Sequence, residues 1–441
     1  MEKELPKNWE RVGFTEIFGI NGGTQPPKSQ FIHEPKEGYI RLLQIRDFGK
    51  KPVPTYIPNT GKLRTCEKDD ILIARYGASI GRIVTGEEGA YNVALAKVNI
   101  PEVMNKNFVK WLLKSHIFQN KIVSFQRTAQ SGFNKDDLSG IIIPLPPLAE
   151  QQCIVTKLDE LFGHLDSLKT RLNHIPQILK NFRQAVLNQA VTGKLTEEWR
   201  VGKALEKWEE TTIGKLFTVK TGATPKRGNT TYYKEGKIPW LKSGQVKNEF
   251  IYEAEEFITD LAVKETNAKL YPKDTLLVAM YGEGKTRGQV GWMKLEAASN
   301  QAIAALVNEE MDIKSKQYVY YYCLSQYLEI RKQAEGGNQP NLNLTKIKNW
   351  KISLPSKEEQ TEIVKRVEHL FAKADAIEAQ YESLKTKIDS LPQAILAKAF
   401  KGELVEQLDT DGSAAVLLEE IQQLKESVSK KTIKTRKKKK K

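Results

Sequence analysis

The sequence predicts an α+β protein in which two pseudo-repeated α/β domains are joined by two long antiparallel coiled-coil helices. Three observations predict this fold. A heptad pattern of apolar residues occurs twice at one fixed offset. Each copy follows about 150 residues of short β-like runs, which Gly, Pro and Asn turns separate. Each of these blocks then closes with one helical pattern before the heptads begin.

The heptad pattern places large apolar residues at alternating steps of four and three, which is the seam of a coiled coil. The offset between the copies is constant, because 363 − 154 and 395 − 186 both equal 209. Pro176 lies inside the first pattern and predicts a kink or a new helix there, whereas Gly193 and Gly402 occupy helix-ending positions. The predicted helix seam consists of Ile154, Leu158, Leu161, Leu165, Leu168, Leu172, Ile363, Val367, Leu370, Ile377, Leu384 and Ile388.

The two blocks contain matching strand-like runs, at 38–43 and 69–77 in the first and at 236–241 and 274–282 in the second. Helices are expected at about 107–125 and 316–332, and their aromatic faces are more typical of core than of a base-stacking platform. Asp411-Gly412-Ser413 predicts the start of one more short helix. The expected segments are domain 1 (1–145), a central helical spacer (146–197), domain 2 (198–354), a distal helical spacer (355–405), a short C-terminal helix (406–428) and a basic disordered tail (429–441).

Chain connectivity favours antiparallel helices. The second block leaves the end of the first helix and enters the start of the second, and parallel helices would force it to bridge about 48 Å at roughly 1.5 Å per residue. The expected arrangement is therefore a rod with a globular block at each end. A coiled coil that serves only oligomerisation is the alternative.

Composition limits the function classes. The net charge is +15, and the last twelve residues contribute nine Lys or Arg without an acid, which leaves +6 for the rest (15 − 9). That excess fits a nucleic-acid binder, and the tail could contact phosphates non-specifically or have no task of its own. No apolar run approaches the roughly 20 residues of a membrane span, so no membrane partner is expected. Three scattered cysteines without metal-like spacing predict a cytoplasmic protein with no metal site.

Catalytic signatures are missing from the sequence. Gly284-Lys285-Thr286 is similar to part of a phosphate-binding loop, but Ala279 stands where that motif needs glycine. We find no recognisable nucleophile set, no cofactor loop and no adenine-methyltransferase motif. The sequence therefore predicts a protein with no catalytic residues and no cofactor of its own.

The duplicated I-x-L-P-x-x-x-E-Q run (Ile143 to Gln151; Ile352 to Gln360) and the heptads after it resemble the specificity (S) subunit of Type I restriction–modification systems. The closing Q-A-[VI]-L…G-x-L run (Gln184 to Leu195; Gln393 to Leu404) carries the same resemblance, over nearly the whole chain. The resemblance implies two target-recognition domains that read a bipartite asymmetric site in double-stranded DNA. It also implies docked methyltransferase (M) subunits with S-adenosylmethionine and restriction (R) subunits with ATP/Mg. Pro176 and the unlike turns at 132–134 and 341–343 depart from a strict repeat.

Residues that contact DNA are expected in the loops, because base edges are read by Arg, Lys, Asn and Gln while phosphates also accept bonds from Thr and backbone N–H. Two domains that read different sequences should share a frame and differ at reading positions such as Gln44/Lys242 and Arg75/Met280. Thr24/Thr224 and Tyr76/Tyr281 are interpreted as shared positions. The DNA-binding candidates are Thr24, Gln44, Arg46, Arg75, Tyr76, Ser79, Arg82, Asn92, Thr224, Lys226, Arg227, Lys242, Gln245, Tyr281, Lys285, Arg287, Asn300 and Gln301.

The predicted function is thus a non-catalytic, sequence-reading DNA scaffold. Two rivals stay open at this point. One is a DNA methyltransferase or nuclease whose site is hidden in one domain, and the other is a coiled-coil scaffold without DNA specificity.

Overall fold

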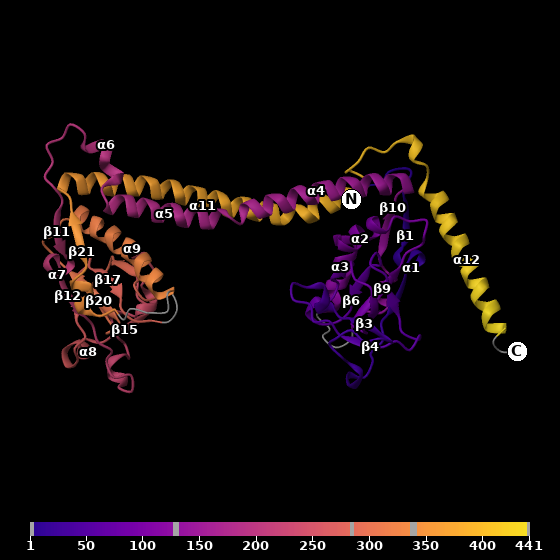
Figure 1. The fold of residues 1–441 in the computed structure, drawn as a ribbon, viewed down its shortest axis with the longest axis horizontal. Helices are drawn as coiled ribbons and strands as arrows, with labels where there is room; N and C mark the ends of the chain where they lie inside the picture. Colours follow the sequence, from indigo (N-terminus) through magenta and orange to yellow (C-terminus); the bar gives the residue numbers. More distant parts are fainter. Residues whose placement is uncertain (1–3, 127–131, 283–285, 336–341, 439–441) are drawn as a thin grey trace. The chain divides into compact units, whose positions relative to one another are not determined.

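The computed structural model describes residues 4–126, 132–282, 286–335 and 342–438. The chain forms two compact units, each described by itself below. The first unit combines Met1–Leu172 with Ser383–Lys441, and the second is Asn173–Glu382. Each unit therefore contains one predicted domain and parts of two long helices (Figure 1).

Each unit contains two larger sheets, and the strand order of each sheet in the first unit is repeated in the second. In the first unit the orders are β2-β9-β6-β7 and β4-β3-β8-β5. In the second they are β12-β20-β17-β18-β14 and β15-β13-β19-β16, so one extra edge strand, β14, is added to an otherwise repeated pattern. The strands of the first unit are β2 (Gly19–Gly22), β3 (Tyr39–Leu43), β4 (Tyr56–Pro58), β5 (Thr65–Cys66), β6 (Leu72–Ala74), β7 (Ile83–Val84), β8 (Gly89–Tyr91) and β9 (Leu95–Asn99). Those of the second are β12 (Thr218–Thr221), β13 (Ile238–Leu241), β14 (Phe250–Ile251), β15 (Glu256–Ile258), β16 (Leu270–Tyr271), β17 (Leu276–Ala279), β18 (Val290–Met293), β19 (Ala297–Ser299) and β20 (Ile303–Val307).

A short antiparallel pair ties each domain to the start of a long helix. β1 (Glu10–Gly13) pairs with β10 (Ile142–Leu145), and β11 (Glu209–Thr212) pairs with β21 (Lys351–Leu354). The registers match, since Glu10 faces Leu145 and Glu209 faces Leu354. Proline ends both pairs on the helix side, as the sequence predicted.

Within its own unit, α2 (Lys106–Lys114) packs on the long helix α4 (Leu148–Leu172) and α9 (Ile313–Glu335) on the long helix α5 (Ile175–Val191), whereas α8 (Asp260–Glu265) lies at the end of its domain away from the long helices (Figure 1). The first predicted domain helix is divided at Ser115, whereas the second is continuous. Phe108 and Trp111 in one and Tyr318 and Tyr321 in the other are buried, which confirms that the aromatic stripes are core. The domain helices are α1 (Phe14–Ile17), α2 (Lys106–Lys114), α3 (His116–Gln126), α7 (Ile213–Leu216), α8 (Asp260–Glu265), α9 (Ile313–Glu335) and α10 (Leu344–Lys348).

The first predicted long helix is two helices, α4 (Leu148–Leu172) and α5 (Ile175–Val191). Pro176 stands in the first turn of α5, where its missing N–H costs nothing, so the prediction that it starts a new segment is confirmed. The second, α11 (Lys357–Ala399), is continuous although Pro392 lies inside it. Gly193 and Gly402 follow α5 and α11 with φ of 77° and 72°, the left-handed conformation that glycine adopts at helix ends.

The long helices run antiparallel within each unit. In the second unit Arg183 bonds Asp375 Oδ1 at 2.6 Å, whereas Arg366 donates to the Leu195 carbonyl at 2.9 Å, so the partner number falls as the chain advances. In the first unit Lys169 pairs with Asp389 at 3.8 Å and Glu150 with Gln407 at 3.1 Å. The predicted antiparallel pairing is confirmed in both.

The predicted seam is only partly buried. Nine of its members are buried or half-buried, whereas Leu168, Ile377 and Leu384 are 48%, 48% and 47% exposed, so their assignment to a closed seam is wrong. A straight α-helix has 3.6 residues per turn, so a strict 3.5-residue pattern drifts around it by about 20° per heptad. The break before α5 displaces the pattern further.

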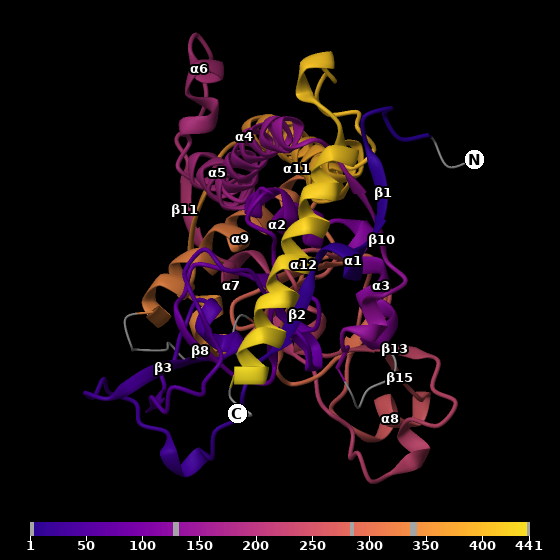
Figure 2. The same cartoon turned by 90° about the vertical axis from the view of Figure 1, so that its right-hand side faces the viewer.

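The C-terminal helix is longer than predicted. α12 covers Ala414–Lys438, so it includes most of the segment that the sequence predicted to be a disordered tail. Ala414, Leu417 and Ile421 are buried in the same core cluster as Trp9 and Phe14. α12 accordingly lies beside β1 and α1 of its own unit (Figures 1 and 2). Between it and α11 lies the short 3-10 helix η8 (Asp409–Asp411), and α6 (Glu197–Arg200) and η5 (Lys194–Thr196) follow α5.

Candidate nucleic-acid interface

Four loops meet at one place in the first unit, which we call the first loop junction. They follow β2, β3, β6 and β8. Three backbone bonds hold them: Thr24 N–H donates to the Tyr91 carbonyl at 3.1 Å, Asn92 to Leu43 at 3.1 Å and Arg75 to Ala94 at 2.8 Å. The polar candidates therefore lie on one edge of the two sheets, where strands end and side chains are not needed for core packing.

The second unit repeats this junction bond for bond. Ala223 N–H donates to the Ser299 carbonyl at 3.0 Å, Asn300 to Leu241 at 2.9 Å and Met280 to Ala302 at 2.8 Å. These bonds confirm that Gln44 corresponds to Lys242 and Arg75 to Met280. They also correct one pairing, since Thr24 corresponds to Ala223. Thr224, which the sequence analysis paired with Thr24, lies one residue further on.

Glycine is required where two loops touch at each junction. A Cβ at Gly23 would stand 2.2 Å from the Asn92 carbonyl oxygen, and one at Gly222 would stand 1.8 Å from that of Ser299. Neither distance is compatible with a side chain. The glycines therefore allow the close approach that brings the loops after β2 and β12 against the loops after β8 and β19.

The basic candidates of the first junction are held by backbone carbonyls. Arg75 Nε donates to Phe133 at 3.0 Å and its guanidinium stands 5.1 Å from the Tyr76 ring centroid, while Arg82 Nη2 donates to Phe48 at 2.5 Å. Arg46 Nη2 donates to the Thr55 hydroxyl at 3.3 Å, and Tyr76 is 40% exposed. Ser79 ends the 3-10 helix η3 (Gly77–Ser79) in the loop after β6 and is half-buried.

Three polar atoms of the first junction are buried without a hydrogen-bond partner in the part of the chain that the structure describes. They are Thr24 Oγ1, Gln44 Nε2 and Asn92 Oδ1. Buried polar groups in proteins are nearly always bonded, so unsatisfied ones need an explanation. A polar ligand that reorders these side chains on binding would supply the missing partners.

The second junction carries a different set of side chains. Lys242 Nζ and Arg227 Nη1 each form an ion pair of 2.6 Å with Glu256, and Thr224 donates its hydroxyl to Gln301 Oε1 at 2.5 Å. Two further candidates bond to the backbone of the loops: Gln245 Oε1 accepts from Lys242 N at 3.3 Å, and Asn300 Oδ1 accepts from Ala302 N at 3.1 Å. The other described candidates differ in exposure, since Lys226 is exposed, Tyr281 is 45% exposed and Arg287 is half-buried. Lys285 lies outside the described residues.

Sequence reasoning missed Glu256 altogether. An acidic residue is unexpected among candidate DNA contacts, and the pairing of β15 with β13 brings it beside Lys242. No local sequence motif predicts that strand pairing, so the position of Glu256 beside Lys242 could be found only from the three-dimensional structure.

It also missed what the repeated Glu of the I-x-L-P-x-x-x-E-Q run does. Glu150 accepts from Trp9 Nε1 at 2.7 Å, and Glu359 accepts from Trp208 Nε1 at 2.9 Å. The Gln that follows ties the first turn of the helix to the segment before it, because its Nε2 donates to the carbonyl of Pro146 or Pro355, at 3.0 and 2.8 Å. The run therefore fastens Trp9 in the first unit and Trp208 in the second to the long helix that supports each domain. Burial raises the pKa of Glu150.

Two of the three cysteines, Cys66 and Cys323, are buried, and Cys153 is exposed. Burial raises the pKa of Cys66 to about 11 and that of Cys323 to about 12, so both thiols are protonated at neutral pH. Over the described ranges, no group of three or more His, Cys, Asp or Glu is placed to hold a metal ion. Nor does any helix there have the length and apolar character to cross a bilayer.

Two similar junctions with unlike polar side chains, each in a domain tied to a long helix, define a protein class in which one chain carries two copies of the same domain. The family model "Type I restriction modification DNA specificity domain" matches residues 6–177 and 205–386, once per domain. The chain belongs to that family.

Curated relatives and solved structures agree with this assignment. The Type I restriction enzyme EcoBI specificity subunit of Escherichia coli is 31% identical, over 94% of this chain and 92% of that protein. The StySPI specificity subunit of Salmonella potsdam is 30% identical over 95% and 96%. The HsdS subunit of Thermoanaerobacter tengcongensis shares the fold, with a TM-score of 0.62 and 18% identity over 91% of this chain and 99% of that one.

Proposed function

We propose that each loop junction reads one half of a bipartite, asymmetric site in double-stranded DNA. The observation that carries the proposal is that one backbone frame is built twice and bears different side chains at equivalent positions. Gln44 in the first unit occupies the backbone position equivalent to Lys242 in the second, and Arg75 occupies the position equivalent to Met280. A shared frame with exchanged polar groups is what two readers of different sequences need, because base edges are distinguished by their donor and acceptor patterns.

The long helices are proposed to serve as the spacer between half-sites and as the docking surface for methyltransferase (M) and restriction (R) subunits. The exposed seam residues support docking: Leu168 and Leu384 in the first unit and Ile377 in the second each leave nearly half of a large apolar side chain in water. Catalysis would then reside in those partners, with S-adenosylmethionine on the M subunits and ATP/Mg on the R subunits. The cytoplasm, where chromosomal DNA is reached, is the proposed location.

Sequencing the methylated bases of host DNA with and without this gene tests the proposal. The expected result is the loss of one gapped, asymmetric methylated motif. Gln44→Ala should then relax the motif in one half only, and Lys242→Ala in the other half only. A motif that changes in both halves with either variant contradicts the assignment of one half-site to each junction.

The two rival functions give different results. A methyltransferase or nuclease hidden in one domain predicts that the purified chain alone labels or cuts DNA. A scaffold without DNA specificity predicts no footprint on any sequence and binding that salt does not weaken.

A further inference from the structure

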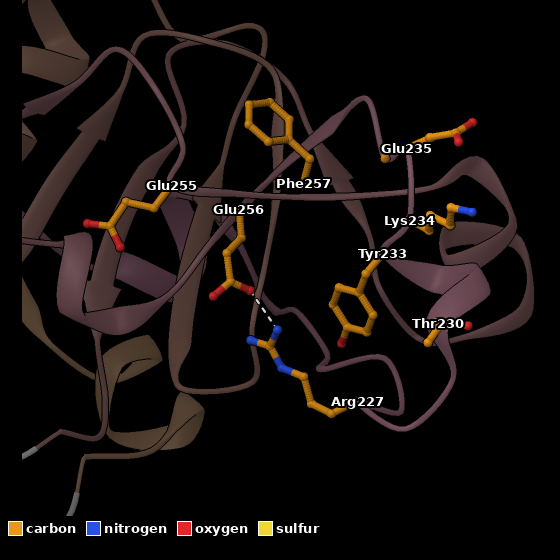
Figure 3. Close-up of a pocket in the computed structure, with 9 residues that line it drawn as sticks. Arg227, Thr230, Tyr233, Lys234, Glu235, Glu255, Glu256 and Phe257 are labelled. Carbon is orange, nitrogen blue, oxygen red and sulfur yellow. Dashed lines mark hydrogen bonds and ion pairs between the residues drawn. The ribbon is translucent and has the colours of Figure 1, made fainter.

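Glu256 joins two of the predicted DNA contacts in the second unit. Its Oε1 pairs with Lys242 Nζ and its Oε2 with Arg227 Nη1, both at 2.6 Å (Figure 3 shows the second pair). We call these three residues the Glu256 triad. Each carboxylate oxygen thus has its own cation, and the triad keeps a net charge of +1. The side chains of Arg227, Lys242 and Glu256 are 51%, 37% and 30% exposed, so all three can be reached from solvent.

Aromatic side chains hold Arg227 in place. Its guanidinium carbon stands 4.8 Å from the Tyr233 ring centroid and 4.9 Å from that of Trp240. Both rings are themselves fixed, since Tyr233 Oη donates to the Pro225 carbonyl at 2.5 Å and Trp240 Nε1 donates to that of Ala223 at 3.1 Å. These bonds also tie down the turn that carries Arg227. The side chain is therefore pre-organised before any ligand arrives, which lowers the entropy lost on binding.

The donors that remain free suit a particular base. A guanidinium has five N–H groups and an ammonium has three, so the bonds to Glu256 leave several donors on both cations. In the major groove guanine presents two adjacent acceptors, O6 and N7, and paired donors from Arg or Lys are the commonest way to read it. The ion pairs lower the pKa of Glu256 and raise that of Arg227, so the charges persist at neutral pH.

We propose that Arg227 and Lys242 read a guanine in the half-site of the second domain, and that Glu256 is the positioning residue that aims them. The inference rests on the proposed function, because it names the base that this junction recognises. Phosphate contact is the competing role for two basic residues. A carboxylate between them argues against it, because an acid beside a phosphate weakens the attraction that a phosphate contact uses.

The first unit shows that the frame does not need the triad. Strand register places Thr55 where Glu256 stands, and Gln44 where Lys242 stands. An amide at this position favours adenine, whose N6 and N7 form a donor–acceptor pair that Gln matches. The second unit thus has Lys242 and Glu256 where the first has Gln44 and Thr55. On the proposed function, this difference changes which base the junction prefers while the backbone stays the same.

The test uses the full chain expressed with its partner subunits in a host, and reads the methylated motif from host DNA. Glu256→Gln should lower discrimination for one guanine in one half-site by roughly 5- to 100-fold and leave the other half-site unchanged. Glu255→Gln is the matched control, because that carboxylate is 3.9 Å from Lys242 Nζ and 63% exposed; its motif should equal the wild type. Lys242→Gln should shift the same position from guanine towards adenine, a gain that misfolding cannot produce.

The possible results distinguish failure of the guanine assignment from failure of the proposed function. If wild type yields no motif, the proposed function itself fails. If wild type yields a motif but Glu256→Gln matches it, or lowers methylation equally at every sequence as loss of a phosphate contact would, the guanine assignment is overturned. The unaffected half-site serves as an internal control for folding of the first unit.

Discussion

The buried bond between Trp208 and Glu359 should contribute measurably to the stability of the second unit. Glu359 is fully buried and accepts from Trp208 Nε1 at 2.9 Å and from the Thr196 hydroxyl at 2.6 Å, with Arg200 Nε at 3.2 Å. Hydrogen bonds to a charged group are worth about 1.5–3 kcal/mol. Trp208→Phe removes the indole N–H and retains an aromatic ring, whereas Glu359→Gln removes the charge and retains similar volume.

A double-mutant cycle isolates the pair. We expect a coupling free energy of about 1.5–3 kcal/mol between the two substitutions, well above the few tenths found for independent sites. Scanning calorimetry of the full chain measures it, and each kcal/mol should lower the melting temperature of a unit of this size by about 2–4 °C. Trp199→Phe is the control, because this tryptophan stands 3.3 Å from Lys203 Nζ outside the Glu359 contacts. A coupling below about 0.5 kcal/mol would refute the anchoring role of this bond.

Three further predictions concern stability. Burial raises the pKa of Glu150, so its protonated form stabilises the first unit at low pH. That contribution to the free energy of unfolding is lost as pH rises through the folded-state pKa. Calorimetry at several pH values should find this pH dependence reduced in Glu150→Gln. Gly222→Ala should destabilise the second unit by more than about 2 kcal/mol in denaturant titrations, because its Cβ would stand 1.8 Å from a carbonyl oxygen, whereas Gly228→Ala has open space and should change little. Leu165→Ala should cost about 2–5 kcal/mol and Leu168→Ala less than about 1, since the first is 3% and the second 48% exposed; equal losses would contradict the revised seam.

Much of the fold follows from one-dimensional patterns. The constant offset of 209 between the two heptad copies required two equal units, and chain connectivity required antiparallel helices. Local rules also placed Pro176 at a helix start and Gly193 at a helix end correctly. The exposure of Leu168 could not be predicted this way, because the heptad assumption treats an interrupted helix as an ideal continuous supercoil.

The loop junctions were predictable as regions and unpredictable as contacts. Matching strand-like runs in the two blocks indicated where Arg75 and Lys242 would lie, because both residues come at or just after the end of such a run. Which side chains they meet depends on pairings between strands far apart in sequence. Glu256 lies beside Lys242 because of the register in which β15 pairs with β13. The equivalence of Thr24 and Ala223 is seen only from their backbone bonds, to the Tyr91 carbonyl in the first unit and to the Ser299 carbonyl in the second.

Under the proposed function, a division between backbone frame and base-reading side chains would let one fold acquire new DNA specificities. Backbone bonds and the glycines at 23 and 222 hold the loops, and the side chains of Lys242 and Glu256 take no part in those backbone bonds. Lys242 and Glu256 in one unit and Gln44 and Thr55 in the other occupy equivalent positions without altering the strand order. A reader can therefore change by substitution of a few side chains. The Trp–Glu anchors need no compensating change, because in the described part of the chain their bonds do not involve these four residues.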